Sequence, residues 1–289
     1  MDDKKVYQGL CIDGGGILGV GAARALMEFE QESGKPIIEQ FDYIAGTSTG
    51  AILAVLLSLG FTAEDCYRLY KEKGKDIFYI PNLIWKFNPL KPKYSNEKFI
   101  KLLDDLLGTK TMKDLKIPTY VATSNIIKKE THVFNRTRTP DDLLKDVILK
   151  TTAAPTYFPT QGEWVDGGLW ANDPSLMGTL GFKRYKACEF KDIRVLSIGT
   201  GGDTIQKPFD TSKMTLVHWI KPLLDFLFTG LESANEFYMR NLGLHDYERV
   251  DPTFNKEYVL DDISKMDMYS TIWENLYKSN KETFEKFFR

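Results

Sequence analysis

The first sixty residues alternate between short apolar runs and glycine-rich turns, and each turn is followed by a longer apolar stretch. Val6–Ile12 has the length and composition of a buried strand, and a helical pattern runs from about Ile17 to Glu32. Phe41–Ala45 is a second strand-like run, and Ala51–Leu59 is apolar on every side, as expected for a buried helix. This order of strand, turn and helix predicts a parallel sheet with helices on its faces.

Shorter elements continue the alternation along the rest of the chain. Thr119–Ile126 and Thr131–Phe134 are expected to pair as strands around the charged turn Lys128-Lys129-Glu130. Arg194–Ile198 is another strand-like run that ends in glycines. Helical patterns recur at three places, Ala63–Lys73, Asn96–Leu107 and Asp141–Lys150. Because no repeat or break in composition marks a linker, we expect one domain.

The composition excludes several classes of protein. The 289 residues are 43% hydrophobic, and 38 basic against 40 acidic residues give a net charge of −2. A protein that binds a nucleic-acid polymer has a basic excess, and a disordered chain has few apolar residues, so neither class fits. The cysteines, Cys11, Cys66 and Cys188, are odd in number and far apart, so we expect neither a disulfide framework nor a metal site.

The N-terminal residues lack the apolar core of a secretion signal. The longest amphipathic candidate for a membrane span, Met214–Phe228, is shorter than the roughly 20 apolar residues that a span needs, and it carries polar residues. We therefore expect a soluble protein of a reducing compartment, the cytoplasm.

One motif has the spacing of a nucleophile at a sharp turn. Gly46-Thr47-Ser48-Thr49-Gly50 fits G-x-S-x-G, and it lies between a strand-like run and an apolar helix. This context exposes the serine hydroxyl above the sheet and directs helix amides at it. A tight turn without chemistry is the alternative, because glycine, serine and threonine are common turn residues.

The first glycine turn allows two interpretations. Gly14-Gly15-Gly16-Ile17-Leu18-Gly19 fits the G-x-G-x-x-G pattern of dinucleotide sites, and its amides can bind an anion. A dinucleotide site needs an acidic residue at the end of the next strand. Glu39 and Asp42 precede that strand, whose end is occupied by the serine turn. We therefore favour an oxyanion of an acyl-transfer reaction as the anion.

A third motif supplies a carboxylate. Asp166-Gly167-Gly168 follows a short strand-like run, although Asp-Gly is also a common β-turn. A serine nucleophile usually has a histidine base, but His132 lies beside charged residues, where we expect it at the surface. His218 and His245 lie in neither a glycine turn nor a strand-end loop. A triad with histidine is therefore disfavoured.

Together the three motifs resemble those of the patatin-like phospholipases. The match runs from about Val6 to Gly202 and includes Ala153-Ala154-Pro155-Thr156-Tyr157-Phe158-Pro159 and Ser197-Ile198-Gly199-Thr200-Gly201. The resemblance implies a three-layer α/β/α fold around a central, mostly parallel sheet. It makes residues 1–289 one acyl hydrolase domain, with family motifs within about 6–202 and a helical remainder at 203–289.

The resemblance also implies a Ser–Asp dyad that needs no cofactor or metal. Ser48 would attack an acyl ester of a phospholipid or lysophospholipid, and Asp166 would accept its proton. The amides of Gly14, Gly15 and Gly16 would stabilise the oxyanion. Further glycines support the motifs, namely Gly19, Gly46, Gly50, Gly167 and Gly168. Since aspartate with its usual pKa of about 3.9 is a weak base, we expect burial beside Trp164 or Leu169 to raise it.

The chain departs from the family at one position of the first motif. Family members often carry a cation before its last glycine, where this chain has Leu18. Arg24, further along the expected helix, is a candidate substitute for that charge.

A lipid hydrolase must reach a membrane surface, and two segments are candidates for this contact. Ile80–Lys93 mixes aromatic, aliphatic and basic residues between prolines, and Met214–Phe228 is amphipathic. The simpler interpretations, which we favour, are a connection that packs on the core and a core or dimer-interface helix kinked at Pro222.

The sequence therefore supports three hypotheses about function. The first is a phospholipase A or lysophospholipase that meets the membrane transiently, as a monomer or homo-oligomer, and that a small molecule or protein could activate. The second is a dinucleotide-binding oxidoreductase, which leaves Ser48 and Asp166 without a role. The third is a catalytically silent member that acts by binding.

Overall fold

A central sheet organises the protein. The computed structural model describes residues 5–86, 88, 91–203, 215–254 and 260–289. Within them, seven strands form one sheet in the order β4-β3-β2-β1-β6-β8, and β5 pairs with β3. The β1–β2, β2–β3, β1–β6 and β6–β8 pairs are parallel, whereas β4 and β5 run antiparallel to β3. The strands are β1 (Tyr7–Ile12), β2 (Tyr43–Thr47), β3 (Thr119–Asn125), β4 (Glu130–Phe134), β5 (Trp164–Asp166), β6 (Ile193–Ile198) and β8 (Asp246–Val250).

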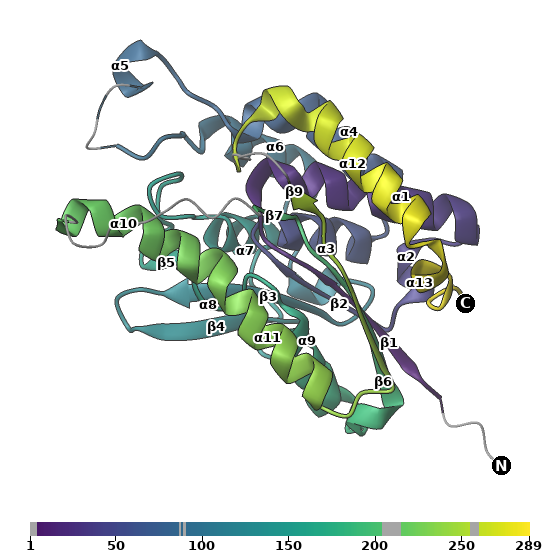
Figure 1. Ribbon diagram of the computed structural model, residues 1–289. Coiled ribbons are helices and arrows are strands. Elements are labelled where there is room, and N and C mark those ends of the chain that lie inside the picture. Colours follow the sequence, from purple (N-terminus) through teal and green to yellow (C-terminus); the bar gives the residue numbers. More distant parts are fainter. Residues whose placement is uncertain (1–4, 87, 89–90, 204–214, 255–259) are drawn as a thin grey trace.

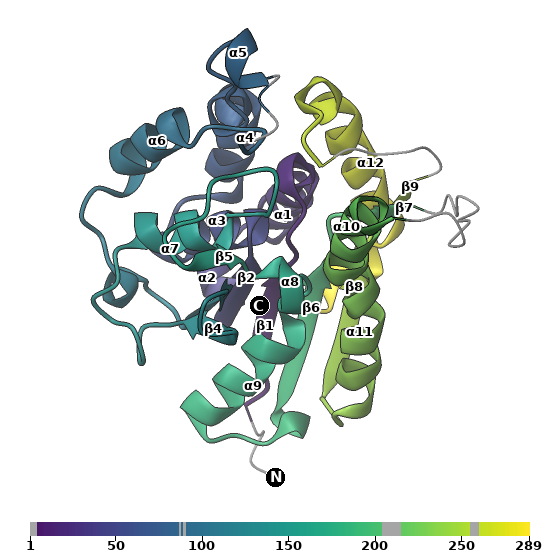
Figure 2. The same ribbon diagram turned by 90° about the vertical axis from the view of Figure 1, so that its left-hand side faces the viewer.

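Helices cover both faces of the sheet (Figure 1; Figure 2). Along β1, Leu10 and Ile12 face one hydrophobic cluster and Cys11 faces the other, as the alternation of side chains in a strand requires. The larger cluster holds α1 (Gly19–Ser33), α3 (Thr49–Leu59), α4 (Ala63–Ile77), α6 (Glu97–Leu107), α7 (Leu144–Thr151), α12 (Met266–Ser279) and α13 (Lys281–Glu285). The smaller cluster packs α9 (Ser175–Lys186) and α11 (Leu231–Asn241) on the other face. The predicted three-layer α/β/α architecture is confirmed.

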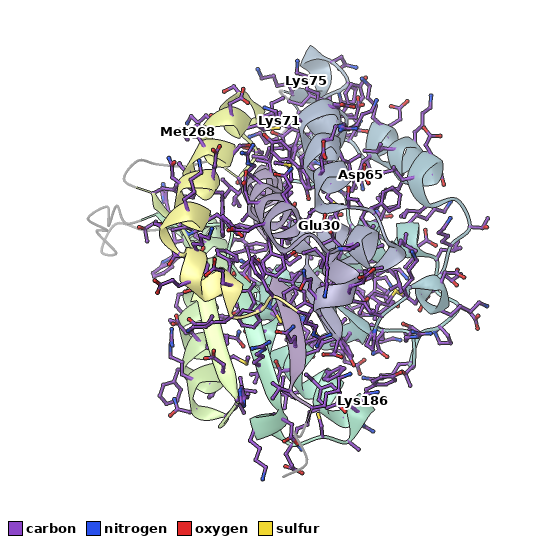
Figure 3. The ribbon with its side chains drawn as sticks, turned by 90° about the vertical axis from the view of Figure 1, so that its right-hand side faces the viewer. Glu30, Asp65, Lys71, Lys75, Lys186 and Met268 are labelled. Atoms are coloured by element: carbon purple, nitrogen blue, oxygen red, sulfur yellow. The ribbon has the colours of Figure 1, made fainter. Side chains whose placement is uncertain are left out.

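Single side chains tie successive layers together. Glu30 of α1 accepts hydrogen bonds from the amides of Ile37 and Ala63, at the starts of α2 (Ile37–Gln40) and α4 (Figure 3). These amides have no partner inside their own helices, so one carboxylate caps two helix ends. On α12, the fully buried Trp273 packs against Gly21 of α1, where a Cβ would lie 2.0 Å from the indole.

The region after residue 202 is not purely helical, so the prediction of a helical remainder at 203–289 is wrong. Residues 246–250 form β8, which pairs with β6, and Gly202–Asp203 (β7) pairs with Thr253–Phe254 (β9). The pattern Asp246-Tyr247-Glu248-Arg249-Val250 contains three charged residues, which hid a strand at the border of the sheet. Residues 204–214 and 255–259 lie outside the described ranges.

The other predicted elements are present at their expected places. The predicted pairing of the strands around Lys128-Lys129-Glu130 is confirmed as the antiparallel β3–β4 pair. The helical patterns at 63–73, 96–107 and 141–150 correspond to α4, α6 and α7. In the described ranges, no helix combines the length and apolar character that crossing a bilayer requires.

Candidate active site

Strand β3 brings together two chain segments that are far apart in sequence. Thr47, the last residue of β2, pairs with Ala122, and β2 ends there. The next residue of β3, Thr123, pairs with Asp166 of β5. Because β4 occupies the other edge of β3 at the same residue, β5 takes the place in the sheet that β2 leaves. Asp166 therefore lies in line with Thr47 and beside Ser48.

Ser48 occupies a strained turn between β2 and α3. Its φ of 52° and ψ of −121° are unusual for a residue with a side chain. The turn closes because Gly50 lacks a side chain, since a Cβ there would lie 2.1 Å from the Ile12 carbonyl oxygen. The Ser48 amide donates to the Thr151 hydroxyl at 3.0 Å, which fixes the turn to α7. The local structure is the one predicted from G-x-S-x-G.

The two side chains of the predicted dyad are in direct contact. Ser48 Oγ donates a hydrogen bond to Asp166 Oδ2 at 2.7 Å, and Gly168 N donates to Asp166 Oδ1 at 2.7 Å. Asp166 is only 1% exposed, whereas Ser48 is half-buried. Burial without a cationic partner raises the pKa of Asp166 to about 7, although both hydrogen bonds lower it. The carboxylate can thus exchange a proton near neutral pH.

The first glycine turn lies against the serine turn. A Cβ at Gly14 would lie 3.3 Å from Ser48 Cβ, so the two turns are in contact. The Gly14 carbonyl accepts from Thr200 Oγ1 at 2.5 Å and from Asn172 Nδ2 at 3.4 Å. The Gly15 N–H belongs to the same planar peptide as this carbonyl and points the opposite way. Thr200 and Asn172 therefore set the direction of the Gly15 amide.

The predicted set of three oxyanion donors needs a correction. The Gly14 amide already donates to the Asn172 carbonyl at 3.1 Å, so it is occupied. The Gly15 and Gly16 amides have no acceptor among the described residues, and they are the two available donors. Gly16 also requires its glycine, because its φ is +59° and a Cβ would lie 2.2 Å from the Leu260 carbonyl oxygen.

Behind the glycine turn lies a buried charge cluster that the sequence did not reveal. Arg249 of β8 is 7% exposed and contacts four carboxylates and the Ser197 hydroxyl. Its contacts are Asp13 at 2.8 Å, Asp251 at 3.0 Å, Asp173 at 3.4 Å, Glu232 at 3.4 Å and Ser197 at 2.9 Å. Burial raises the pKa of Glu232 to about 7 and raises those of Asp13 and Asp251.

The Arg249 cluster holds the backbone of the glycine turn in place. Asp13 directly precedes Gly14, and Asn172 Nδ2 donates both to the Gly14 carbonyl and to Glu232 Oε1, the latter at 2.8 Å. In the sequence, Arg249 stands between Glu248 and Val250 in a segment predicted to be helical, which gives no sign of the cluster. Asp251 follows Arg249 by two residues, but Asp13, Asp173 and Glu232 come from three other segments, which only the fold brings together.

Other predicted residues lie elsewhere. Arg24 pairs with Glu28 and Glu274 between α1 and α12, so it does not replace the cation missing at Leu18, which is itself buried in the core. His132, expected at the surface, is half-buried in edge-to-face contact with aromatic rings, and burial lowers its pKa.

The other two histidines are also away from the dyad. His218 lies in α10 (Leu216–Asp225), and its Nδ1 contacts Thr215, which precedes that helix. The His245 amide donates to the carbonyl of Ile193 at the start of β6. In the described part of the chain, no histidine bonds to Ser48 or Asp166.

The two segments expected to contact membranes or the core are only partly described. In Ile80–Lys93, residues 83–86 form α5, Trp85 Nε1 donates to the Pro92 carbonyl at 3.0 Å, and residues 87, 89 and 90 lie outside the described ranges. In Met214–Phe228, Met214 lies outside them, and α10 continues into the π-helix η5 (Phe226–Gly230). Of the two favoured interpretations, a core helix is wrong, because Leu223 and Phe226 are 52% and 60% exposed, and a dimer-interface helix stays a prediction.

Comparison with known proteins adds independent findings. The patatin-like phospholipase family model matches residues 10–177. A cGAMP-activated phospholipase of Pseudomonas aeruginosa is 31% identical over 267 residues, covering 85% of this chain and 78% of that protein. Patatin-like protein 4 of Arabidopsis thaliana is 26% identical over 339 residues, covering 94% of this chain and 83% of that protein. The structure of VipD from Legionella pneumophila is similar in fold, with a TM-score of 0.50, 14% identity, and coverage of 95% and 67% of the two chains.

The Arg249 cluster leads to a prediction about stability. In Arg249→Met, two buried and two half-buried carboxylates lose their shared cation, so we expect the free energy of unfolding to fall by about 3–5 kcal/mol near pH 8. Raised pKa values mean that the folded state binds more protons than the unfolded state, so stability decreases as pH rises from about 4 towards 7 and above. The loss should therefore be smaller near pH 5.5. Urea unfolding at both pH values measures it.

A matched control for this variant is Arg240→Met. Arg240 pairs with Glu236 on the exposed surface of α11, and such a pair contributes about 0.3–0.5 kcal/mol. If Arg249→Met unfolds at the same urea concentration as Arg240→Met at both pH values, the cluster does not stabilise the fold.

Proposed function

The chain belongs to the patatin-like phospholipase family, and we propose that it is a serine acyl hydrolase that releases fatty acids from membrane phospholipids or lysophospholipids. The observation that carries this proposal is the 2.7 Å hydrogen bond from Ser48 to the buried carboxylate of Asp166. A serine on a strained turn with a base in contact is the arrangement that nucleophilic catalysis needs.

In the first half of the reaction, Ser48 Oγ attacks the carbonyl carbon of the ester, and its proton passes to Asp166 Oδ2. The carbonyl oxygen becomes an oxyanion that accepts hydrogen bonds from the Gly15 and Gly16 amides. When the carbon–oxygen bond of the ester breaks, Asp166 gives the proton to the departing alcohol. The fatty acyl group is then esterified to Ser48.

In the second half, water replaces the alcohol. Asp166 takes a proton from the attacking water, the same amides hold the second oxyanion, and Ser48 Oγ leaves with that proton as the free fatty acid forms. One carboxylate therefore acts as base and acid in both halves. Burial supports this role, because a carboxyl group with a pKa of about 7 accepts and returns protons near neutral pH.

The location of Asp42 disfavours the oxidoreductase hypothesis. Asp42 accepts from the amide of Gln8, near the beginning of β1, and pairs with Arg289. Asp42 thus lies at the beginning of β1, whereas the first glycine turn follows the end of that strand. It therefore cannot bind the ribose of a dinucleotide held at this turn. The hypothesis of a silent binding protein makes a different prediction, namely no ester hydrolysis under any condition.

An activator is part of the proposal. A 31% identical relative in Pseudomonas aeruginosa is a cGAMP-activated phospholipase, so cGAMP is the first small molecule to test with this chain. Activity that appears only with cGAMP would still support the hydrolase proposal. We also propose that the protein meets the membrane transiently from the cytoplasm.

The proposal predicts that hydrolysis depends on both members of the dyad. We expect Ser48→Ala to lower fatty-acid release by at least about 10³-fold, and Asp166→Asn by about 10²–10⁴-fold, because an amide cannot accept the proton. The assay measures fatty acid released from mixed phospholipid vesicles, and p-nitrophenol released from p-nitrophenyl butyrate, with EDTA present and with or without cGAMP.

Ser33→Ala, at the end of α1, is the control for the serine substitution. Full activity of Ser48→Ala or of Asp166→Asn would refute the dyad. No activity of the wild type on either substrate, with and without cGAMP, would favour the silent binding protein.

The pKa of Asp166 predicts the pH profile. The reactive form is the ionised carboxylate, so kcat/KM for the butyrate ester should rise about tenfold per pH unit below pH 7 and level off above it. A profile that is already flat from about pH 5 would mean that the base has the pKa of an ordinary aspartate.

The contact of Thr200 with the Gly14 carbonyl predicts a positioning role. Thr200→Val keeps the shape of this buried side chain but removes the hydrogen bond that orients the Gly15 amide. We expect kcat for the butyrate ester to fall about 10–100-fold with KM nearly unchanged, because the donor serves the oxyanion and not the bound ester. Thr200→Ser, which restores the hydroxyl, should recover most of kcat. Equal losses in both variants would assign the effect to packing instead.

A further inference from the structure

The turn between β3 and β4 projects beyond the edge of the sheet where Ser48 lies. The register pairs Thr47 with Ala122, and β3 continues to Asn125, three residues beyond that point. At about 3.3 Å per residue, the strand extends roughly 10 Å past the end of β2. Figure 1 shows this turn, α5 and α10 on the same, left-hand side of the molecule, and Figure 2 shows them around the end of the sheet.

The tip of this turn exposes two adjacent isoleucines. Ile126 is 54% exposed and Ile127 is 72% exposed, the highest value among the large exposed apolar side chains of the described residues. The turn is nevertheless fixed in place. The Ile126 amide donates to the Glu163 carbonyl at 2.9 Å, and the Lys128 amide donates to Oδ1 of the buried Asn125 at 2.9 Å. The fold therefore holds two isoleucines in water by specific hydrogen bonds.

Positive charge lies directly beside these isoleucines. Lys128 and Lys129 are exposed, and neither forms an ion pair with any described residue. Glu130 follows them, so the turn carries two positive charges and one negative charge. Apolar side chains flanked by unpaired lysines are the combination that inserts into the headgroup region of an anionic bilayer.

A second apolar projection lies across the site from the turn. Trp219, Leu223 and Phe226, in α10 and the start of η5, are 37%, 52% and 60% exposed. The segment formed by α10 and η5 also reaches the site. Phe228 of η5 packs over Gly168, because a Cβ at Gly168 would lie 2.4 Å from the Phe228 ring. Figure 2 shows α10 on one side of β5 and α8 (Gly168–Ala171), and β4 on the other.

We propose that the Ile126–Lys129 turn and the exposed face of α10 and η5 form one contact surface for an anionic phospholipid bilayer, on two sides of Ser48. The inference rests on the proposed function, since it says how the ester reaches the serine. Two convex projections with a half-buried nucleophile between them fit a deformable lipid surface, into which both can insert at once. Insertion on both sides would bring the acyl esters of the glycerol backbone to the level of Ser48.

Vesicle binding tests the surface without relying on catalysis. All variants are made in the Ser48→Ala background, and the bound fraction is measured by sedimentation with vesicles of phosphatidylcholine alone or mixed with phosphatidylglycerol. We expect Ile126→Ser/Ile127→Ser and Leu223→Ser/Phe226→Ser each to weaken binding to the mixed vesicles at least tenfold. Lys128→Glu/Lys129→Glu should abolish the preference for phosphatidylglycerol.

The matched control is Leu180→Ser/Lys186→Glu. Leu180 is 46% exposed on α9, and Lys186 ends that helix, just before the chain enters the sheet edge opposite Ser48 (Figure 3). This variant removes the same kinds of side chain from another surface, and we expect it to bind vesicles like the parent. Equal loss in the control, or parental binding by both serine variants, overturns the proposal. So does loss of self-association in the turn variant with unchanged vesicle binding, which would assign the turn to a second copy of the chain.

A probe at the tip supplies a second measurement. Cys188 is replaced by serine, the other two cysteines being buried, and Ile127→Cys is labelled with an environment-sensitive nitrobenzoxadiazole dye. We expect its emission to shift to the blue when mixed vesicles are added, whereas a label at Leu180→Cys should not respond. An unresponsive tip label overturns the proposal. Because every variant carries Ser48→Ala, these tests measure membrane binding alone. Their outcome does not depend on whether the wild type hydrolyses lipid.

Discussion

The register of β3 is the constraint on which the candidate site depends. β2 ends opposite Ala122, and β5 continues the sheet from Thr123, so a strand separated from Ser48 by more than a hundred residues places Asp166 at its hydroxyl. A shift of one residue would turn the Asp166 side chain to the other face of the sheet, because side chains alternate along a strand. The same strand, continued beyond this point, carries the turn with the exposed isoleucines.

Burial raises the pKa of the carboxylates on both sides of the glycine turn, but their partners differ. Asp166 is buried without a cation, so its pKa rises to about 7, and the group can exchange protons at neutral pH. Asp13 is buried as deeply, and burial raises its pKa too, but it lies 2.8 Å from Arg249, which partly offsets that rise and ties the carboxylate into the Arg249 cluster. One aspartate is thus suited to proton transfer and the other to anchoring the segment that precedes Gly14. The difference arises from one arginine on β8.

Local patterns in the sequence were sufficient for the β-turn-α units, whereas the dyad was predicted from the resemblance of three motifs to one family. Gly46 to Gly50 and Asp166 to Gly168 have their signals within five residues, and the structure places Ser48 and Asp166 in contact. The signals for β8 and Arg249 were missing, because a charged strand at the border of a sheet has no apolar run, and Asp13 and Asp173, which Arg249 contacts, lie on other segments. The occupied Gly14 amide was equally hidden, since it depends on the backbone of Asn172, 158 residues away.

In the proposed mechanism, the absence of a cation at position 18 makes the orientation of the glycine amides decisive. Leu18 is buried in the core, Arg24 pairs with carboxylates on the outer helices, and Arg249 faces four carboxylates, so none of these offers net positive charge to an oxyanion. The proposed mechanism relies instead on the dipole of each free amide, whose effect depends on its direction. Thr200 and Asn172 fix that direction by donating hydrogen bonds to the Gly14 carbonyl. In the proposed mechanism, these two hydrogen bonds compensate for the cation that is absent at position 18.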